Sequence, residues 1–346
     1  MLNSSDIVAL FHRQFLLCNV TADEAASVFA DSSSRPEYIE AAFSALRLIG
    51  ARAVVVTVPT YSAALFPSQA SADILAPYPQ AIDALSRSSF VVDVTCSGIV
   101  HSQVRAQIQK AGARILTIIE PPETLERLAS QPDMKPRVLT AARLLDRAKV
   151  IRVTSKAGTD VTFQRGTNPV GYQYGLADEP GRWDHWPSGF AAVYPEDRTA
   201  EGQIVLDSGD IVYPLNRYIH DPVMIQIRRG FIERIEGKGL DADLLRSYLE
   251  AWSNPDAFAT SHVGWGVDHG AQWIASLLYS AKEHIGMDGR SFAGNFLWST
   301  GPNKFVDRHV GCHYDIAMRR CTVMLDEQAV VNEGRLAYDE HTGESL

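Results

Sequence analysis

A change of hydrophobic pattern near residue 150 is the feature that most constrains the fold of this chain. Before it, short runs of consecutive apolar residues alternate with segments in which apolar residues recur at helical spacing. Continuous apolar strands between amphipathic helices are typical of a mostly parallel β-sheet with helices on both faces. The predicted strands are residues 52–59, 90–95 and 114–119, and the predicted helices are residues 36–51, 81–88, 102–113, 121–130 and 135–148. We therefore predict an α/β N-terminal domain with a mostly parallel sheet over residues 1–149.

After residue 150, apolar and polar residues alternate with a period of two, as expected for antiparallel strands that have one buried face. Residues 149–166 (KVIRVTSKAGTDVTFQRG) show this alternation on both sides of a turn at Ala157-Gly158, which predicts a hairpin. Further predicted strands lie within residues 202–215, 222–237 and 313–337, and the predicted helices are residues 241–252 and 270–285. We therefore predict an α+β C-terminal domain with antiparallel strands over residues 150–346.

Composition excludes several classes of protein. The chain has 346 residues, of which 46% are hydrophobic, a length that favours two domains. It carries 32 basic and 41 acidic residues, a net charge of −9, without a Lys/Arg-rich stripe, which argues against a nucleic-acid surface. Its four cysteines lie far apart, which favours a reducing compartment.

The N-terminal segment does not have the pattern of a signal peptide. His12, Arg13 and Gln14 interrupt its apolar stretch, which predicts an amphipathic helix instead. No segment reaches the ~18 consecutive apolar residues that a membrane span needs. We expect a cytoplasmic protein that contacts neither membrane nor nucleic acid and that forms a homo-oligomer.

The stretch GCHYDIAM, residues 311–318, contains the pattern that most directly suggests chemistry. On a strand, residues i and i+2 point to the same face, so His313 and Asp315 would project together while Tyr314 points away. An imidazole nitrogen beside a carboxylate oxygen makes one edge of a metal site. The alternative is a hydrogen-bonded surface pair.

A third ligand has two candidates, His262 and His269, in the Gly-rich stretch TSHVGWGVDHG between two predicted helices. Two histidines and one carboxylate on a face leave coordination positions open, as in non-haem ferrous oxygenases. His269 lies where the predicted helix 270–285 would have its N-cap. His309 and His313 have the spacing of a helical zinc pair, but Gly311 and the strand pattern argue against a helix, so His309 is expected near the site rather than in it.

Two further histidines lie where the predicted fold would expose them to a ligand. His101 follows a predicted parallel strand, and ligands of open α/β sheets bind beyond the carboxyl ends of strands. Alternatively, His101 caps the following helix. His185 lies in GRWDHWPSG, a predicted aromatic loop in which Trp183 and Trp186 suit a planar substrate. Alternatively, His185 packs between the two tryptophans, which then belong to the core.

Taken together, these segments resemble a known family. RVTSKAGTDVTF (152–163), GRWDHWPSG (181–189), GQIVLDSG (202–209) and the terminal H-x-D strand are similar to the aminopeptidase T-like metalloprotein superfamily. Within it, the chain most resembles the 2,5-dihydroxypyridine 5,6-dioxygenase family of pyridine and nicotinate degradation. The resemblance covers most of the chain.

The resemblance implies a ferrous ring-cleaving dioxygenase. Its metal ligands would be His262, His313 and Asp315, and its acid/base residues would be His101 and His185. It implies Fe(II) as cofactor, with O2 and a small aromatic N-heterocycle as substrates. Both atoms of O2 would enter 2,5-dihydroxypyridine to give N-formylmaleamic acid.

The chain differs from the pattern of the peptidases at positions where they bind metal, and these differences bear on an alternative function. The peptidases bind two metals, and their pattern calls for a glutamate where this chain has His262. It also calls for a histidine within residues 293–303, where this chain offers Asn295, Phe296 and Trp298. An aminopeptidase T-like metallopeptidase with an altered metal site is the alternative. A non-catalytic binding protein that keeps the fold is a third possibility.

Overall fold

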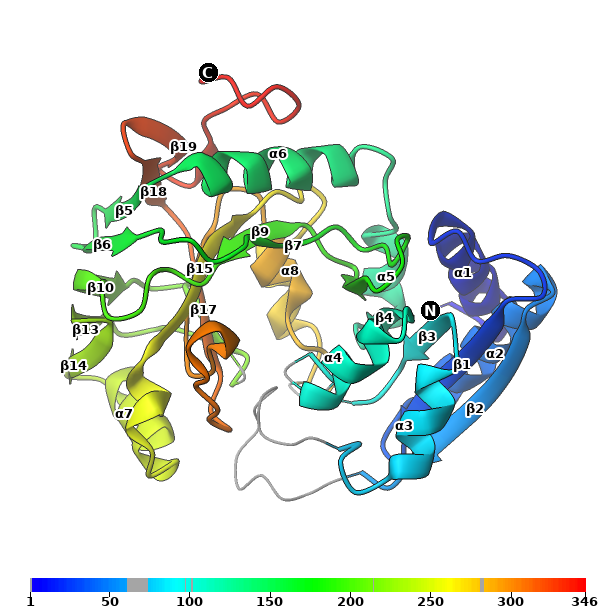
Figure 1. Ribbon diagram of the computed structural model, residues 1–346. Helices are drawn as coiled ribbons and strands as arrows, with labels where there is room; N and C mark the ends of the chain where they lie inside the picture. The colour runs from blue at the N-terminus through cyan, green and yellow to red at the C-terminus, as the bar shows by residue number, and fades with distance from the viewer. Residues whose placement is uncertain (1, 61–73, 97, 101, 214, 281–282) are drawn as a thin grey trace.

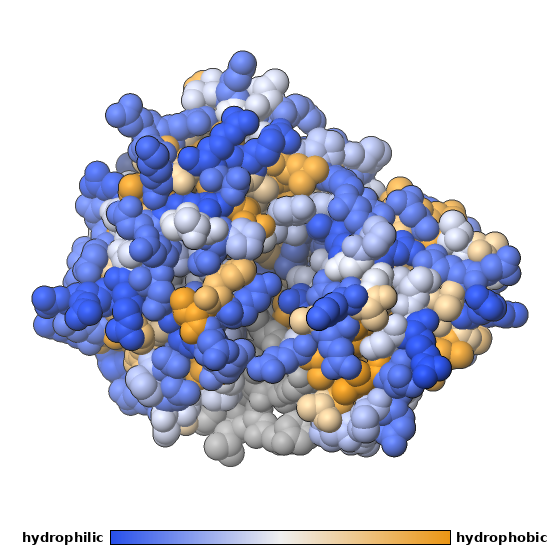
Figure 2. All heavy atoms as spheres, in the orientation of Figure 1, coloured by the Kyte–Doolittle hydropathy of each residue, from blue (hydrophilic) through white to orange (hydrophobic). Residues whose placement is uncertain are grey.

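The computed structural model describes residues 2–60, 74–96, 98–100, 102–213, 215–280 and 283–346, and its strands form three β-sheets (Figure 1). In Figure 1 the first sheet lies on the right and the other two on the left and in the centre. The visible face of the molecule is mostly hydrophilic, with small scattered groups of hydrophobic side chains (Figure 2). Within the described residues, no helix combines the length and the apolar character needed to cross a membrane.

The first sheet has five parallel strands in the order β2-β1-β3-β4-β8. Its strands are β1 Ala25–Asp31, β2 Arg52–Val58, β3 Phe90–Asp93, β4 Arg114–Ile118 and β8 Trp183–Trp186. The helices of this part are α1 Ser4–Leu17, α2 Pro36–Ile49, α3 Pro79–Ser86, α4 Gln103–Lys110 and α5 Pro122–Arg127. One apolar core joins the sheet to α1 and α2 and another joins it to α3 and α4, so both faces are covered. The predicted α/β domain with a mostly parallel sheet is confirmed.

The second sheet has eight strands, and every pair of neighbours in it is antiparallel. In sheet order these are β14 Phe231–Glu236, β13 Val223–Arg228, β10 Glu201–Leu206, β6 Asp160–Gln164, β5 Val150–Ser155, β18 Cys321–Leu325, β19 Gln328–Asn332 and β20 Arg335–Leu336. The predicted hairpin is β5–β6, and Gly158 supplies the positive φ of 114° in its turn.

The third sheet has seven antiparallel strands and carries the residues of interest. In sheet order these are β12 Arg217–Tyr218, β11 Ile211–Tyr213, β17 Tyr314–Met318, β16 Phe296–Thr300, β15 Thr260–Gly266, β9 Phe190–Val193 and β7 Gly171–Gln173. One continuous apolar core lies between this sheet and the second. The helices α6 Met134–Arg147 and α7 Leu240–Ala251 also contribute to it. The predicted antiparallel character of the C-terminal part is confirmed.

Several sequence predictions for this part are wrong in detail. The Gly-rich stretch that contains His262 forms a strand, β15, that was not predicted, and the predicted aromatic loop around His185 contains the strand β8. The predicted helix 270–285 is replaced, within its described residues, by a short 3₁₀ helix at Trp273–Leu277. Tertiary contacts explain this difference, because Trp273 Nε1 donates to Gly209 O (2.7 Å) and the Gln272 N–H donates to Asp288 (2.7 Å).

The remaining short elements are the 3₁₀ helices Pro255–Phe258 (η1) and Lys304–Val306 (η3), and the helix α8 Met287–Ser291. The division of the chain at residue 149/150 stays a prediction, and two elements connect the parts on either side of it. Helix α6 contributes side chains to the core of the antiparallel sheets, while β8 returns to pair with β4 in the parallel sheet.

Close packing of β15 against β9 yields a test of the fold. A Cβ on Gly264 would lie 2.0 Å from the Ala191 carbonyl oxygen, so we expect Gly264→Ala to lower the free energy of unfolding by about 1–3 kcal/mol, as overpacking does. Gly171→Ala is the matched control, because Gly171 faces β9 from the other side and its Cβ would lie 3.6 Å from Ala192 O. Urea unfolding of both variants measures the difference, and equal stabilities would contradict the packing described.

Candidate metal centre

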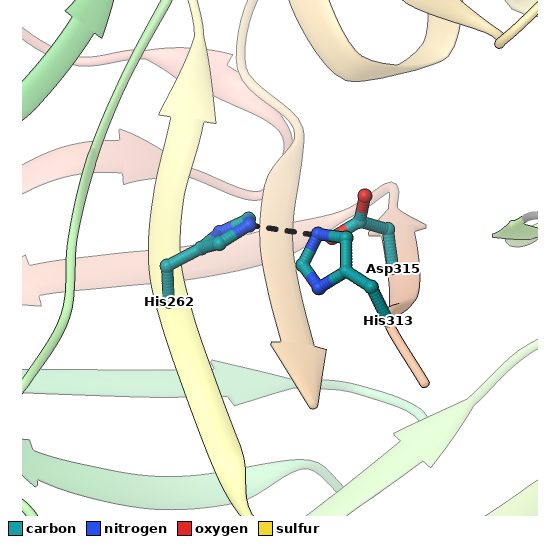
Figure 3. A group of neighbouring side chains, drawn as sticks. All are labelled: His262, His313 and Asp315. Carbon is teal, nitrogen blue, oxygen red and sulfur yellow. Dashed lines mark ion pairs between the residues drawn. The ribbon is translucent and has the colours of Figure 1, made fainter. Parts of the chain in front are cut away.

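Three side chains that the sequence analysis singled out converge in the structure (Figure 3). His262 comes from β15, His313 directly precedes β17, and Asp315 lies within β17. Asp315 Oδ1 is 3.2 Å from His313 Nε2 and 3.4 Å from His262 Nε2. One potential ligand atom from each residue lies within 4.8 Å of the other two. The predicted same-face projection of His313 and Asp315 is therefore what the fold produces.

The central strand β16 makes room for this convergence. β15 and β17 flank β16, and Ser299 of β16 pairs with Asp315. The register of β15 shifts between Thr260 and Val263, which takes His262 out of the regular ladder. Ser299 Oγ compensates for this, because it accepts from the His262 N–H (2.9 Å) and donates to the His262 carbonyl (3.2 Å). A small polar residue at this position thus satisfies the irregular backbone and leaves space above it.

The orientation of His313 is fixed by a backbone carbonyl. His313 Nδ1 lies 3.1 Å from Thr300 O, which can only accept, so Nδ1 carries the proton of this hydrogen bond. The other ring nitrogen, Nε2, lies 3.2 Å from Asp315 Oδ1. An imidazole held in this way through its other nitrogen is the usual arrangement of a metal-binding histidine.

Asp315 is buried, and its second oxygen is bound by Arg290 of α8. Arg290 donates to Oδ2 from Nε (3.1 Å) and from Nη2 (2.8 Å), and its guanidinium lies 4.1 Å from the ring centre of Tyr213 on β11. Burial alone would raise the pKa of Asp315, but His313 and Arg290 hold that pKa well below its usual range. Asp315 is therefore a carboxylate at neutral pH, and Oδ1 makes no hydrogen bond of ordinary geometry within the described residues.

His262 is an uncharged imidazole at neutral pH. Burial lowers its pKa to about 4, against the opposing effect of Asp315. Tyr194 meets the His262 ring edge-to-face, with centroids 5.6 Å apart. A neutral imidazole offers a lone pair to a metal without first losing a proton.

The geometry of the three donor atoms fits a single metal ion. Ligand atoms at about 2.1 Å from an ion in neighbouring coordination positions lie roughly 3.0–3.4 Å apart. The separations of Asp315 Oδ1 from the two imidazole nitrogens, 3.2 and 3.4 Å, fall in that range, and all three atoms lie within 4.8 Å of one another. An electron-rich Oδ1 faces two imidazole nitrogens, an arrangement that a cation would stabilise. Within the described part of the chain, no other group of three or more His, Cys, Asp and Glu side chains gathers in this way.

The three residues border a cavity of about 770 Å³ between the parallel sheet and the third sheet. This volume is within the usual range for small-molecule sites. His185 and Trp183 also line the cavity, so the fold brings His185 to the same space as the three candidate ligands. Trp186 does not line it, because it is fully buried in the core with its ring centre 5.7 Å from that of Phe11.

His185 is a buried, uncharged imidazole. It lies in β8 opposite Thr117 of β4, and neither ring nitrogen makes a hydrogen bond of ordinary geometry within the described residues. Burial lowers the pKa of His185 to about 3. The alternative was that His185 packs between the two tryptophans. It does not describe the structure, because Trp183 lines the cavity whereas Trp186 is buried in the core.

The remaining histidine predictions have mixed outcomes. His101 lies outside the described residues, and the described N-cap of α4 is Ser102, which accepts from the Val104 and Arg105 N–H groups. His269 is half-exposed and pairs with Glu340 (2.6 Å), away from the three candidate ligands. His309 lines the cavity and pairs with Asp307 (2.7 Å), as a neighbour of the site rather than a member.

Sequence reasoning missed three residues that build the site: Arg290, Ser299 and Thr300. Arg290 lies 25 residues from Asp315 in a short helix without a motif, so no spacing rule indicates it. Ser299 and Thr300 lie on β16, a strand that the sequence analysis did not predict. Recognition of FLWST as a buried central strand next to an H-x-D strand is the one signal that could have found them.

The fold and this cluster define a protein with an α/β part, an antiparallel part and a candidate mononuclear metal centre. A model of the 2,5-dihydroxypyridine 5,6-dioxygenase family matches residues 6–338, and the chain belongs to this family. A 2,5-dihydroxypyridine 5,6-dioxygenase of Pseudomonas putida is 37% identical to it over 350 residues, which cover 98% of each sequence. The resemblance found in the sequence is thus confirmed.

Two solved structures are also similar. The 2,5-dihydroxypyridine dioxygenase of Pseudomonas putida KT2440 matches with a TM-score of 0.94 at 38% identity, covering 99% of this chain and 100% of that one. Wild-type AmpT from Thermus thermophilus matches with a TM-score of 0.64 at 12% identity, covering 95% of this chain and 98% of that one. The second match shows a shared fold.

The buried ion pair of Asp315 yields a prediction on stability. With metal removed, we expect Arg290→Gln to lower the free energy of unfolding by about 3–5 kcal/mol at pH 7, because it leaves a buried carboxylate without its cation. Arg152→Gln breaks an exposed pair of similar geometry with Asp160 and should change stability little. Urea unfolding checks both, and a similar loss in the two variants would contradict the role given to Arg290.

The low pKa of His185 yields a prediction on pH dependence. Between pH ~6.5 and ~3 the unfolded chain protonates this imidazole but the folded protein does not, so its burial costs progressively more stability as the pH falls. His185→Gln removes this cost. Relative to the wild type, the variant should therefore become more stable as the pH is lowered from 7 to ~4. A pH-independent difference in urea unfolding would show that His185 is not buried in the neutral form.

Proposed function

We propose that this chain is an Fe(II)-dependent ring-cleaving dioxygenase that converts 2,5-dihydroxypyridine and O2 to N-formylmaleamic acid. The observation that carries the proposal is the convergence of His262 Nε2, His313 Nε2 and Asp315 Oδ1 at the wall of a cavity of about 770 Å³. Membership of the 2,5-dihydroxypyridine 5,6-dioxygenase family supports both the reaction and the substrate.

The donor set favours iron over other metals. Two imidazoles and one carboxylate on one side of an ion, with positions left open, suit ferrous iron in oxygenases. Iron bound there would supply the redox chemistry that allows O2 to react with an electron-rich ring. Arg290 and the Thr300 carbonyl would hold the carboxylate and one imidazole in place for it.

The residues around the cavity would bind and orient the substrate ring. Trp183 presents an aromatic surface, and its Nε1–H donates to Thr117 Oγ1 (3.0 Å), which fixes the indole. His185 is available as a neutral imidazole, which can donate one hydrogen bond and accept another. We assign it to steadying the reacting oxygen atoms through its N–H, and we assign removal of the hydroxyl proton to His101.

The peptidase alternative finds little support in the site. Asn295 occupies the segment where the peptidase pattern calls for a second imidazole, and its side chain is fully committed to the backbone. Its Oδ1 accepts from the Gly266 N–H (2.7 Å), and its Nδ2 donates to the carbonyls of Gly289 (2.6 Å) and Arg290 (3.0 Å). Asn295 therefore supports the chain around Arg290 and is not free to bind a second metal.

The decisive experiment is anaerobic reconstitution with Fe(II), followed by admission of O2 in the presence of 2,5-dihydroxypyridine. We expect O2 uptake to match loss of the pyridine one-to-one, measured with an oxygen electrode and by ultraviolet absorbance. Aminoacyl-amides with Zn(II), Co(II) or Mn(II) should not be cleaved. Metal-dependent peptide hydrolysis without O2 uptake on hydroxylated pyridines would favour the metallopeptidase.

The ligand assignment predicts a loss of metal. Ala replacement of His262, His313 or Asp315 should reduce bound iron from one per chain to a small fraction of that, because each removes one of three protein ligands. His269→Ala is the matched control, since that histidine lies outside the cluster, and it should keep its iron. Iron analysis after desalting, with circular dichroism as a check on folding, measures this. Full occupancy in His262→Ala would disprove the assignment.

The acid/base assignment predicts a loss of turnover without a loss of metal. His101→Ala and His185→Gln should each retain iron and lower kcat by about 10²–10⁴-fold, the usual contribution of a positioned proton-transfer group, with the smaller loss for His185. Steady-state kinetics at matched iron content measures the effect. Near-normal kcat in either variant would remove that residue from the mechanism.

A further inference from the structure

The cavity is electropositive although the protein as a whole carries a net charge of −9. Its described lining includes five Lys and Arg side chains but two carboxylates, Glu179 and Asp315. Three of the five cations are neutralised by nearby carboxylates: Arg182 by Asp184 (2.5 Å), Arg290 by Asp315 (2.8 Å) and Arg308 by Asp197 (2.8 Å). The other two, Arg105 and Lys304, form no ion pair with any described residue.

Arg105 of α4 is held in a fixed position without a counter-ion. Its guanidinium carbon lies 4.7 Å from the ring centre of Trp183, and the indole is fixed in turn by Thr117. Thr117 Oγ1 donates to the buried Asp93 carboxylate (3.0 Å). Arg105 Nε is buried and makes no hydrogen bond within the described residues. A buried donor without an acceptor is costly, so this guanidinium is placed for a ligand rather than for the fold.

Lys304 lines the same cavity as Arg105, and the two charges are close enough to interact. Partial burial of the Lys304 ammonium and the nearby Arg105 both lower the pKa of Lys304. Burial lowers the pKa of Arg105 to about 10, which leaves it cationic at neutral pH. Two cations placed together without an anion repel each other, and an anion bound between them would relieve that repulsion.

Tyr194 connects this cation pair with the candidate metal centre. The Tyr194 ring contacts His262 on one side (5.6 Å between centroids) and Phe305, the neighbour of Lys304, on the other (5.5 Å). It also lies near Arg105, whose pKa its hydroxyl raises. The two cations and the three candidate ligands thus line a single cavity, and Tyr194 lies between His262 and Phe305 within it.

We propose that Arg105 and Lys304 form a carboxylate-binding subsite that takes the ionised acid group of the ring-opened product. This inference rests on the proposed function. 2,5-Dihydroxypyridine carries no carboxylate. When one O2 adds across carbons 5 and 6 and the bond between them breaks, carbon 6 becomes the N-formyl group. Carbon 5, which bore the hydroxyl, becomes a carboxylic acid that releases its proton to water.

The subsite therefore recognises a charge that the reaction creates. Two cations in the same cavity as the candidate ligands would attract carbon 5 as it becomes a carboxylate and would hold the opened chain away from those ligands. A substituted pyridine that already carries a ring carboxylate would present the same group to the two cations, so a substrate is a second source of this ligand.

The test is a binding measurement that requires no turnover. Calorimetry on anaerobic Fe(II)-loaded protein compares maleamate, which carries a carboxylate, with the uncharged diamide maleamide. We expect Arg105→Gln and Lys304→Gln each to weaken maleamate binding about tenfold or more, the usual loss for a charge-assisted contact, and to leave maleamide binding within about twofold. Arg87→Gln, an exposed cation paired with Asp83, is the matched control and should change neither. Lys304 is exposed, so its variant keeps the test sound if Arg105→Gln folds poorly.

The outcomes separate this inference from the proposed function. Unchanged maleamate affinity in both variants, or an equal loss for maleamide, overturns the subsite. If O2 uptake is normal, the proposed function survives that result. Weakened maleamate binding in a protein that shows no O2 uptake supports the subsite and counts against the function. To identify the source of the carboxylate, product inhibition is compared with turnover of 2,5-dihydroxypyridine bearing a ring carboxylate. Weaker product inhibition in Arg105→Gln and Lys304→Gln identifies the product as the source, and slower turnover of the carboxylated pyridine identifies the substrate.

Discussion

The Asp315 carboxylate is the group on which the rest of the site depends. A buried carboxylate is costly unless both oxygens find partners, and Arg290 binds Oδ2 alone. The other oxygen points into the cavity toward two imidazoles, of which His262 is neutral and His313 already uses its Nδ1 proton on Thr300. Within the described residues, Oδ1 makes no hydrogen bond of ordinary geometry. A cation bound between Oδ1 and the two imidazoles would therefore be stabilised at this place, and a divalent ion would suit it.

The convergence of the two imidazoles on Oδ1 depends on the strand order of the third sheet. The two histidines and the aspartate come from segments about 50 residues apart in sequence, and only because β16 lies between β15 and β17 do they face one space. A large side chain at Ser299 would fill that space, and a residue without a hydroxyl would leave the irregular backbone of His262 unsatisfied. The same strand leads back to Asn295, which fixes the chain next to Arg290. Ligand, counter-ion and backbone support thus belong to one connected unit.

The sequence predicts the parts of this unit that depend on local pattern. Period-two alternation correctly places His313 and Asp315 on one face, and alternating strands and helices correctly give the parallel sheet. His262 was singled out as a ligand candidate, but its strand was not predicted, because the glycines of TSHVGWG weaken a strand pattern although in the structure they permit close strand packing. Residues 270–285 have helical periodicity, yet contacts of Trp273 with a distant backbone override it. Arg290 has no sequence signal at all, because its role arises from a contact between segments that no local rule connects.

The cavity belongs to both halves of the chain, and β8 explains how their relative position is fixed. Residues 187–189 alone separate β8, the last strand of the parallel sheet, from β9 of the third sheet. Trp186 anchors this connection in the N-terminal core against Phe11, while β9 pairs with the strand that carries His262. His185 therefore cannot shift without moving one sheet relative to the other. Such a connection between rigid elements positions an imidazole from one sheet relative to the three candidate ligands from another, which is the precise placement that the proposed reaction would need.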